Sequence, residues 1–289
     1  MYCEFFGFSE KPFNVTPDPR FLFLTPGHRE ALASLLYGIR DRRGFIALIG
    51  ATGTGKTTLL NAAMQQLGQK TKVAFIFNSD LPFMQVMAMI LDELGLLRPV
   101  RGLNKITALR RLNGLAVSQM AAGGNLAIMV DEAQNLSRVT IENLRLLSNL
   151  ESHTHKLIQI VLAGQPELEV KLSRSQNRQF AQRISMKRCI DPLAEKDSYK
   201  YIQHRLAKAG YNGSALFSRK ALQLIWRHSQ GVPRRINILC DNVLLNAYGM
   251  GQKKIKTLAV AEAIDDLTFN KSNGNKPPFR SMQSKAAML

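Results

Sequence analysis

The chain is poor in cysteine and has no long apolar run. Its 289 residues include three cysteines, Cys3, Cys189 and Cys240, which are far apart in the sequence. Few, widely spaced cysteines are typical of reduced thiols in a cytoplasm rather than of a disulfide framework. No apolar run reaches the roughly 18 residues that a membrane span requires. The start "MYCEFFGFSEKPF" contains acids and a proline where a signal peptide needs a basic and then an apolar stretch. We therefore expect a cytoplasmic protein.

Acidic residues are also scarce. The sequence has 21 aspartates and glutamates against 39 lysines and arginines, and its formal net charge is +18. Such an excess favours polyanionic partners, although a solvated basic face explains it equally well. Basic residues without any acid occupy the stretches between Glu93 and Asp131 and between Glu169 and Asp191. The five histidines have no cysteine or carboxylate at metal-ligand spacing, so we expect them at the surface rather than in a metal site.

Short apolar segments alternate with longer segments of helical periodicity. Segments rich in β-branched or aromatic residues predict strands at 45–50, 73–77, 126–130 and 157–163, and a fifth near 183–190. Apolar spacings of three and four predict helices at 57–67, 82–95, 105–121, 137–150 and 166–173. This alternation predicts an α/β fold in which helices cover a five-stranded parallel sheet.

The pattern changes to helices alone after Leu193. Helices are predicted at 195–209, 218–229, 233–248 and 257–267. We therefore expect a nucleotide-binding αβα domain over 1–192 and a helical domain over 193–269. Residues 270–289 are polar and basic and contain a proline pair, which predicts a disordered tail.

The segment "GATGTGKTT" lies between the first predicted strand and the helix that follows it. It matches the spacing G-x-x-x-x-G-K-[ST] of a P-loop, for which a strand-to-helix context is expected. Backbone N–H groups and the helix N-terminus would cradle phosphates, Lys56 would reach the β- and γ-phosphates, and the Thr57 hydroxyl would join the Mg²⁺ shell. The predicted nucleotide-binding residues are Gly50, Ala51, Thr52, Gly53, Thr54, Gly55, Lys56, Thr57 and Thr58.

Two adjacent carboxylates follow the third predicted strand in "LAIMVDEAQNL". Asp131 stands at the strand end, where it can hold Mg²⁺ through water, and Glu132 comes next, where it can polarise an attacking water. A surface pair at a strand end is the alternative without function. A small-molecule kinase has no need of a glutamate there, so the pair favours hydrolysis over phosphoryl transfer.

Gln165, Arg234 and an arginine cluster are further candidates. Gln165 ends the fourth strand in "VLAGQPEL", where its amide can orient the water or sense the γ-phosphate, unless it is only a turn residue before proline. Arg234 begins a helix in "GVPRRIN", where a closing lid can place it on the nucleotide. Arg174, Arg178 and Arg183 have no expected acceptor in their own subunit. Each is a candidate arginine finger for a neighbouring subunit, or else a basic surface residue.

Together these motifs resemble the AAA+ ATPases, and more narrowly the ExeA/GspA family. The resemblance covers residues 1 to about 268 and is carried by "FFGFSEKPFNVTPDPRF", "GATGTGKTTLL", "VDEAQNL", "IVLAGQPEL", "QRI" and "GVPRRINILCD". It implies an AAA+ P-loop NTPase, a five-stranded αβα sandwich with a C-terminal helical lid, that hydrolyses ATP with Mg²⁺. We expect Lys56, Glu132, Gln165, Arg183 and Arg234 to carry the catalysis, and on this resemblance Arg183 is the best candidate finger.

The same resemblance implies a role in the bacterial envelope. Members of the family are implied to energise assembly or export of envelope machinery in Gram-negative bacteria. ExeA/GspA proteins continue into a transmembrane helix and a peptidoglycan-binding domain, which this sequence lacks. The match therefore moves towards the shorter MshM-type proteins of MSHA pilus biogenesis. We expect an ATP-dependent ring or helical homo-oligomer, cytoplasmic or peripheral at the inner membrane, that serves an MSHA-like type IV pilus or type II secretion together with assembly proteins.

Two expectations stay open beside this one. The segment "KPFNVTPDPRF" would lie near the adenine, with Phe13 or Pro17 lining it, unless it is a lead-in that packs on the core. Transposition ATPases of the TniB and TnsC type share "VDEAQ" and the G-x-P-R start of the lid, and they bind DNA as ATP-dependent filaments. The basic excess suits them, but they generally lack the N-terminal block. An ATP-dependent DNA-binding regulator of transposition is therefore the alternative function, with non-specific DNA binding.

Overall fold

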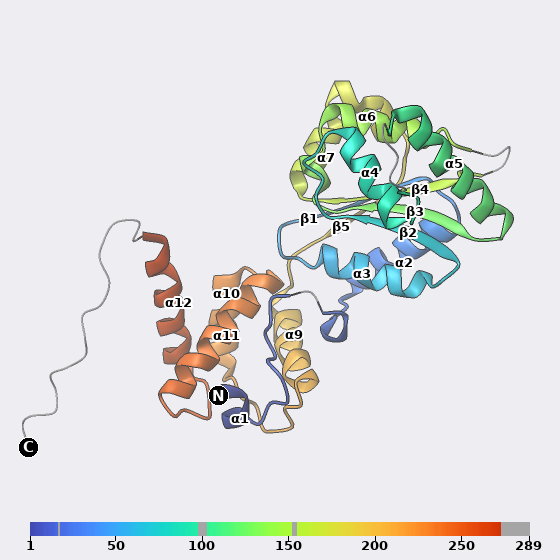
Figure 1. The fold of residues 1–289 in the computed structure, drawn as a ribbon. Helices are drawn as coiled ribbons and strands as arrows, with labels where there is room; N and C mark the ends of the chain where they lie inside the picture. The colour runs from blue at the N-terminus through green and yellow to red at the C-terminus, as the bar shows by residue number, and fades with distance from the viewer. Residues whose placement is uncertain (17, 98–102, 152–154, 273–289) are drawn as a thin grey trace, which may run out of the picture.

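The chain folds into an αβα unit and a helical unit (Figure 1). The computed structural model describes residues 1–272 apart from 17, 98–102 and 152–154. Within this part of the chain, none of the helices combines the length and the apolar character needed to cross a bilayer.

The αβα unit is built on five parallel strands. They are β1 (Phe45–Gly50), β2 (Thr71–Ile76), β3 (Asn125–Val130), β4 (Ile158–Gly164) and β5 (Ile184–Ile190), in the order β2-β3-β4-β1-β5. Every residue of β1 and β4 is buried, as expected for central strands covered on both faces. The predicted five-stranded parallel sheet is confirmed, with each strand boundary within two residues of the expected one.

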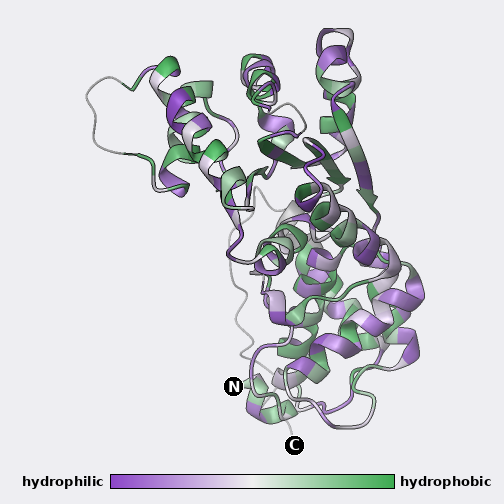
Figure 2. Ribbon diagram, turned by 90° about the vertical axis from the view of Figure 1, so that its right-hand side faces the viewer, coloured by the Kyte–Doolittle hydropathy of each residue, from purple (hydrophilic) through white to green (hydrophobic). Residues whose placement is uncertain are grey.

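Helices cover both faces of the sheet (Figure 1). One face packs on α2 (Pro26–Arg40) and α3 (Lys56–Leu67). The other face packs on α4 (Phe83–Glu93), α5 (Lys105–Ala121), α6 (Arg138–Leu147), α7 (Pro166–Ser173) and α8 (Arg178–Ala181). Figure 2 shows the consequence in hydropathy, because the central strands are predominantly hydrophobic whereas the helices carry both hydrophobic and hydrophilic residues.

Helix α2 was not expected from the sequence. The hydroxyl of Thr25 caps its start by accepting the N–H of His28, and Pro26 occupies the first helical position. Its residues Ala31, Leu35 and Ile39 are fully buried on the sheet. The threonine-proline pair ahead of this spacing is the local signal that could have revealed it.

The helical unit contains α9 (Glu195–Lys208), α10 (Arg219–Ser229), α11 (Pro233–Gly249) and α12 (Thr257–Ser272). All four expected helices are present. Helix α12 runs three residues into the segment expected to be a tail, and residues 273–289 lie outside the described part of the chain.

Most of the N-terminal segment, residues 1–16 and 18–23, packs on the helical unit. It contains α1 (Tyr2–Phe6) and the 3₁₀ turn Pro19–Phe21, and it lies beside the C-terminal helices in Figure 1. Its aromatic residues Tyr2, Phe6, Phe8, Phe13 and Phe21 are buried in the core of that unit. The N-terminal segment was expected to belong to the domain over residues 1–192, but its aromatic side chains pack in the core of the helical unit.

The two units are connected at Leu193, where the backbone is closely packed and hydrogen-bonded. Its N–H donates to the carbonyl of Gly231 at 2.8 Å, and its carbonyl accepts the indole N–H of Trp226 at 3.2 Å. Gly231 has a φ of +70°, and a Cβ there would lie 2.0 Å from the Leu193 oxygen. Only glycine allows this approach. The junction thereby fixes where α11 begins.

We predict that Phe13→Ala destabilises the helical unit. Phe13 is 1% exposed, and its ring meets that of Phe217 edge-on with centroids 6.4 Å apart. Truncation of such a ring costs about 3–5 kcal/mol. Urea unfolding followed by the fluorescence of Trp226, the single tryptophan and a residue of α10, measures the loss.

The matched control is Phe77→Ala. Phe77 is 69% exposed, so its truncation should change the free energy of unfolding by less than about 0.5 kcal/mol. Equal unfolding midpoints for the two variants would show that the N-terminal segment is not part of this core.

Candidate active site

The site lies at the edge of the sheet where the strands end. Strands β3, β4 and β1 are neighbours and parallel, so their carboxyl ends meet at one edge. This edge carries the P-loop after β1, Asp131 and Glu132 after β3, and Gln165 after β4.

Lys56 is held inside the P-loop. Its Nζ donates to the carbonyls of Gly50 at 2.9 Å and Ala51 at 3.1 Å, and the residue is 4% exposed. Burial lowers the pKa of the ammonium, while the carboxylates of Glu132 and Asp131 oppose this shift. The lysine therefore has to leave two carbonyls to reach a phosphate.

Thr57 and Asp131 meet directly. The Thr57 hydroxyl donates to Oδ2 of Asp131 at 2.5 Å, and Oδ1 accepts the N–H of Glu132 at 2.9 Å. A hydroxyl and a carboxylate are oxygen donors of the kind that Mg²⁺ takes, usually together with phosphate and water oxygens. Among the described residues, no group of three or more His, Cys, Asp or Glu gathers as a metal site. The Thr57 hydroxyl and the Asp131 carboxylate are therefore chemically suited to a Mg²⁺ ion.

Glu132 is held in an unusual backbone conformation. Its φ is +48°, which is uncommon outside glycine and occurs often at functional sites. Its Oε2 accepts the side-chain amide of Gln165 at 3.0 Å and that of Gln134 at 2.5 Å. Burial opposes ionisation, but these two amides and the nearby Lys56 together lower the pKa of the carboxyl. Glu132 is thus an ionised carboxylate beside the P-loop.

His28 is buried next to the P-loop. It is 5% exposed, whereas the histidines were expected at the surface. Its Nε2 is 3.1 Å from the carbonyl of Thr54, and its Nδ1 is 2.7 Å from the hydroxyl of Thr25. Burial lowers its pKa, which favours the neutral ring that donates to Thr54 and accepts from Thr25. The cap of α2 therefore supports the loop from below.

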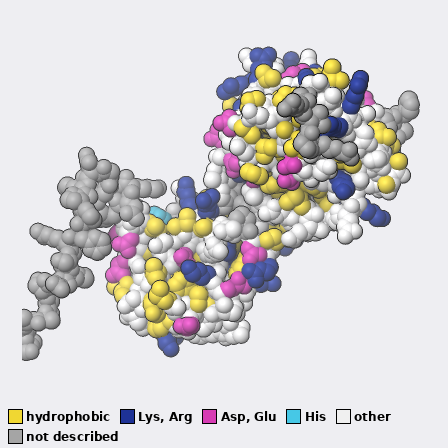
Figure 3. Space-filling view, viewed as in Figure 1, with side chains coloured by type: hydrophobic (Ala, Val, Ile, Leu, Met, Phe, Trp, Pro, Cys, Tyr) yellow, Lys and Arg dark blue, Asp and Glu magenta, His cyan; other side chains and the backbone are white. Residues whose placement is uncertain are grey.

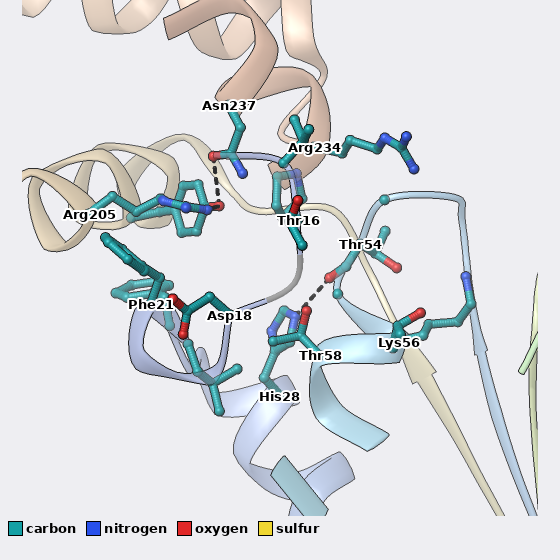
Figure 4. A pocket seen from close by; sticks show the side chains of 18 of the residues that line it. Thr16, Asp18, Phe21, His28, Thr54, Lys56, Thr58, Arg205, Arg234 and Asn237 are labelled. Atoms are coloured by element: carbon teal, nitrogen blue, oxygen red, sulfur yellow. Dashed lines mark hydrogen bonds between the residues drawn. The ribbon is translucent and has the colours of Figure 1, made fainter. Parts of the chain in front are cut away.

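A cavity of about 170 Å³ opens between the two units. Its walls come from the P-loop, the N-terminal segment, α9 and α11, as Figure 4 shows. Thr58 and Glu132 line its sheet side, and Tyr201 and Asn237 line its helical side. A molecule in this cavity would contact both units at once.

Arg205 of α9 connects the N-terminal segment to the helical unit in the wall of the cavity. Its guanidinium donates to the carbonyls of Pro12 at 2.5 Å and Asn14 at 3.0 Å, and it also donates to the Tyr201 hydroxyl at 2.9 Å. It lies 4.7 Å from the centre of the Phe21 ring. The sequence offered no signal for this buried arginine, because the two carbonyls that it binds are about 190 residues away.

Of the two adenine-lining candidates, Phe13 does not line the cavity. Phe13 is buried against Phe217 in the helical core rather than in the cavity wall. Pro17 lies outside the described residues. Asn14, Thr16 and Phe21 of the same segment do line the cavity, so this segment contributes side chains other than Phe13 to the cavity wall.

Arg234 lies in the first turn of α11, next to the P-loop. Its backbone N–H donates to the carbonyl of Gly53 at 3.2 Å, and a Cβ on Gly53 would lie 2.7 Å from that of Arg234. Its side chain lies on the P-loop side of the cavity in Figure 4. The helical unit and the loop are thus in direct contact through this residue.

Arg183 does not join the site. It precedes β5, and β5 runs parallel to β1, so it lies at the opposite edge of the sheet from the P-loop. Its guanidinium donates to the Ser148 hydroxyl at 2.7 Å and to Oδ1 of Asn149 at 2.6 Å. The expectation that it lacks an acceptor in its own subunit is therefore wrong. Arg174 and Arg178 are exposed.

Basic side chains are spread over both units. On the face shown in Figure 3 they do not merge into one continuous patch.

The sequence and the structure were compared with those of known proteins. Residues 39–172 match the family model of an AAA domain. General secretion pathway protein A of Aeromonas hydrophila is 43% identical over 256 residues, which are 88% of this chain and 46% of that protein. An uncharacterized HTH-type transcriptional regulator of Methanocaldococcus jannaschii is 28% identical over 144 residues, 48% of this chain and 34% of that one. The chain thus spans less than half the length of these curated relatives.

Solved structures share the fold. The Aeropyrum pernix ORC1 protein in complex with DNA has a TM-score of 0.66 at 18% identity, over 89% of this chain and 69% of that one. Cdc6p from Pyrobaculum aerophilum has a TM-score of 0.64 at 18% identity, over 91% and 70%. At such identities the likeness concerns the fold alone, and it confirms the expected AAA+ architecture. With the AAA domain match and the 43% identity over 88% of this chain, the expected resemblance to the ExeA/GspA family of AAA ATPases is confirmed.

Proposed function

We propose that this protein hydrolyses ATP in a Mg²⁺-dependent reaction at the edge of the sheet described above. The observation that carries the proposal is the meeting of Lys56, Thr57, Asp131 and Glu132 at one end of the cavity. Phosphate-binding backbone, a positive charge, oxygen ligands and a carboxylate base are the parts that NTP hydrolysis needs.

The P-loop residues bind and orient the phosphates. The backbone N–H groups of the loop and the start of α3 provide a positive end for them. Lys56 exchanges the carbonyls of Gly50 and Ala51 for phosphate oxygens. Thr57 and Asp131 would hold Mg²⁺, which neutralises phosphate charge when it is bound.

Glu132 and Gln165 act on the attacking water. The ionised Glu132 carboxylate accepts a proton from the water, which makes the water a better nucleophile. The Gln165 side-chain amide donates a hydrogen bond to Glu132, and a rotation of this side chain would direct the amide towards a γ-phosphate. Arg234 adds positive charge from the helical unit, so that nucleotide binding is coupled to the position of α11.

We predict that two site variants lose different steps of the reaction. Lys56→Ala should abolish ATP binding, because the loop then offers no positive side chain to the phosphates. Glu132→Gln should keep ATP binding and lose hydrolysis. Fluorescent-nucleotide titration and steady-state turnover separate the two effects, and full turnover in Glu132→Gln would exclude its role as the base.

We also propose that ATP assembles the subunits into a ring or helix in which Arg183 reaches a neighbour's site. Its location at the edge opposite the P-loop supports this, because a head-to-tail contact brings opposite edges of two subunits together. Arg183 would exchange Ser148 and Asn149 for the neighbour's phosphate.

Mixing of inactive variants tests this shared site. Arg183→Ala and Glu132→Gln subunits should each be inactive, and their mixture should regain turnover, because some interfaces combine an intact Glu132 with an intact Arg183. The control replaces Glu132→Gln with a subunit that carries both substitutions, which should restore nothing. A mixture that stays inactive where intact subunits turn over would remove the support for a finger at Arg183.

We propose that this ATPase energises a bacterial envelope machine. The 43% identity to general secretion pathway protein A supports this role. Type II secretion or an MSHA-like pilus is the proposed machine, with inner-membrane or assembly proteins as partners and a location in the cytoplasm or at the inner membrane. Binding to DNA is the alternative, and the charge of +18 favours it.

DNA binding separates the two functions. For an envelope ATPase, we expect only weak duplex binding that vanishes at physiological salt, because a surface without a continuous basic patch, as on the face in Figure 3, neutralises few phosphates. Log affinity should fall by about 0.9 per phosphate contact with log salt. Filter binding at two salt concentrations, with ATP and with the Lys56→Ala variant as control, measures both. Tight, ATP-dependent binding that survives physiological salt would establish the transposition-type alternative.

A further inference from the structure

Gln134 contacts the Glu132 carboxylate and has no part in the proposed reaction described above. It follows Glu132 by two residues in "DEAQ" and lies in the 3₁₀ turn Ala133–Asn135. Its Nε2 donates to Oε2 of Glu132 at 2.5 Å, the same oxygen that accepts the Gln165 amide.

The other end of the Gln134 side chain is also held. Its Oε1 accepts the backbone N–H of Gln165 at 3.1 Å, which orients the amide with its nitrogen towards Glu132. The three residues therefore form a closed ring of hydrogen bonds between the ends of β3 and β4. Such a ring leaves the Glu132 carboxylate little rotational freedom.

The surroundings fix Gln134 further. The Lys171 ammonium of α7 donates to its backbone carbonyl and, at 2.9 Å, to that of Leu136. A Cβ at Gly164 would lie 3.0 Å from Oε1 of Gln134 and 2.7 Å from Leu168, so glycine leaves the space that this amide occupies. Sequence reasoning missed both Gln134 and Lys171.

The two amides on Glu132 are not equivalent. Gln134 is anchored by the backbone N–H of Gln165, whereas Gln165 reaches Glu132 with its side chain. The Gln165 side chain can therefore turn to a γ-phosphate without releasing Gln134. Glu132 then keeps one donor.

We propose that Gln134 is the positioning residue that keeps the Glu132 carboxylate aimed at the attacking water while Gln165 contacts the nucleotide. This inference rests on the proposed role of Glu132 as the base. In this proposal Gln134 acts on the reaction only through its hydrogen bond to Glu132.

Gln134→Met tests the inference, because methionine keeps the length of the side chain and removes the amide. We expect kcat to fall about tenfold, the order of magnitude of a lost hydrogen bond to a charged group. The KM for ATP should change less than about twofold, because Gln134 contributes nothing to nucleotide binding. Gln203→Met, at an exposed position of α9, is the matched control and should change neither constant.

A double-mutant cycle separates positioning from a structural role. In the Glu132→Gln background, single-turnover measurements should show no further loss from Gln134→Met, because the group that it positions is gone. An equal loss in both backgrounds would overturn the proposal, and so would an unchanged kcat in Gln134→Met. If Gln134→Met does not fold, Gln134→Asn takes its place, since its shorter side chain withdraws the amide from Glu132.

An NMR readout tests the contact without turnover. In nucleotide-free protein, the Gln134 side-chain NH₂ signal, assigned by its loss in Gln134→Met, should shift when Glu132→Gln removes the charged acceptor. An unshifted signal would overturn the proposal. An inactive wild-type protein with a shifted signal would instead count against the proposed function, so the two failures are distinguishable.

Discussion

The parallel order of three central strands is the constraint on which the site depends. Because β3, β4 and β1 are adjacent and point the same way, the P-loop, Glu132 and Gln165 emerge at one edge of the sheet. Strands β1 and β4 are buried along their whole length, so a slip in register would move every side chain into the wrong layer. The core thereby holds the reacting groups within hydrogen-bonding distance of one another.

The second determinant is the way in which the two units share one cavity. The N-terminal segment starts on the helical core, passes Arg205 and enters α2 beneath the P-loop, where His28 supports the loop. The chain crosses again at Leu193, where Gly231 closes the junction. A nucleotide in the cavity therefore touches elements whose relative position is set by buried hydrogen bonds, and movement of the helical unit changes its surroundings.

The charged groups of the site are already paired by the protein. Lys56 donates to loop carbonyls, Asp131 accepts from Thr57, and Glu132 accepts from two amides. Such pairing is expected, because a buried charge without a partner is strongly destabilising. Nucleotide binding must then exchange these contacts for others, so the site responds to its ligand through defined hydrogen bonds. The closed ring through Gln134 is the part of this network that can persist during the exchange.

The sequence by itself determined the strands, most helices, the P-loop and the pair Asp131–Glu132, because each depends on local periodicity or on a short motif with a physical mechanism. Helix α2 also had a local signal, the Thr25 cap followed by Pro26. Only the tertiary structure decided the rest: that Arg205 binds carbonyls about 190 residues away, that Arg183 has acceptors at the end of α6, and that Gln134 lies on Glu132. No spacing in the sequence encodes these contacts. They form only when packing brings distant segments together and sets the orientation of the side chains.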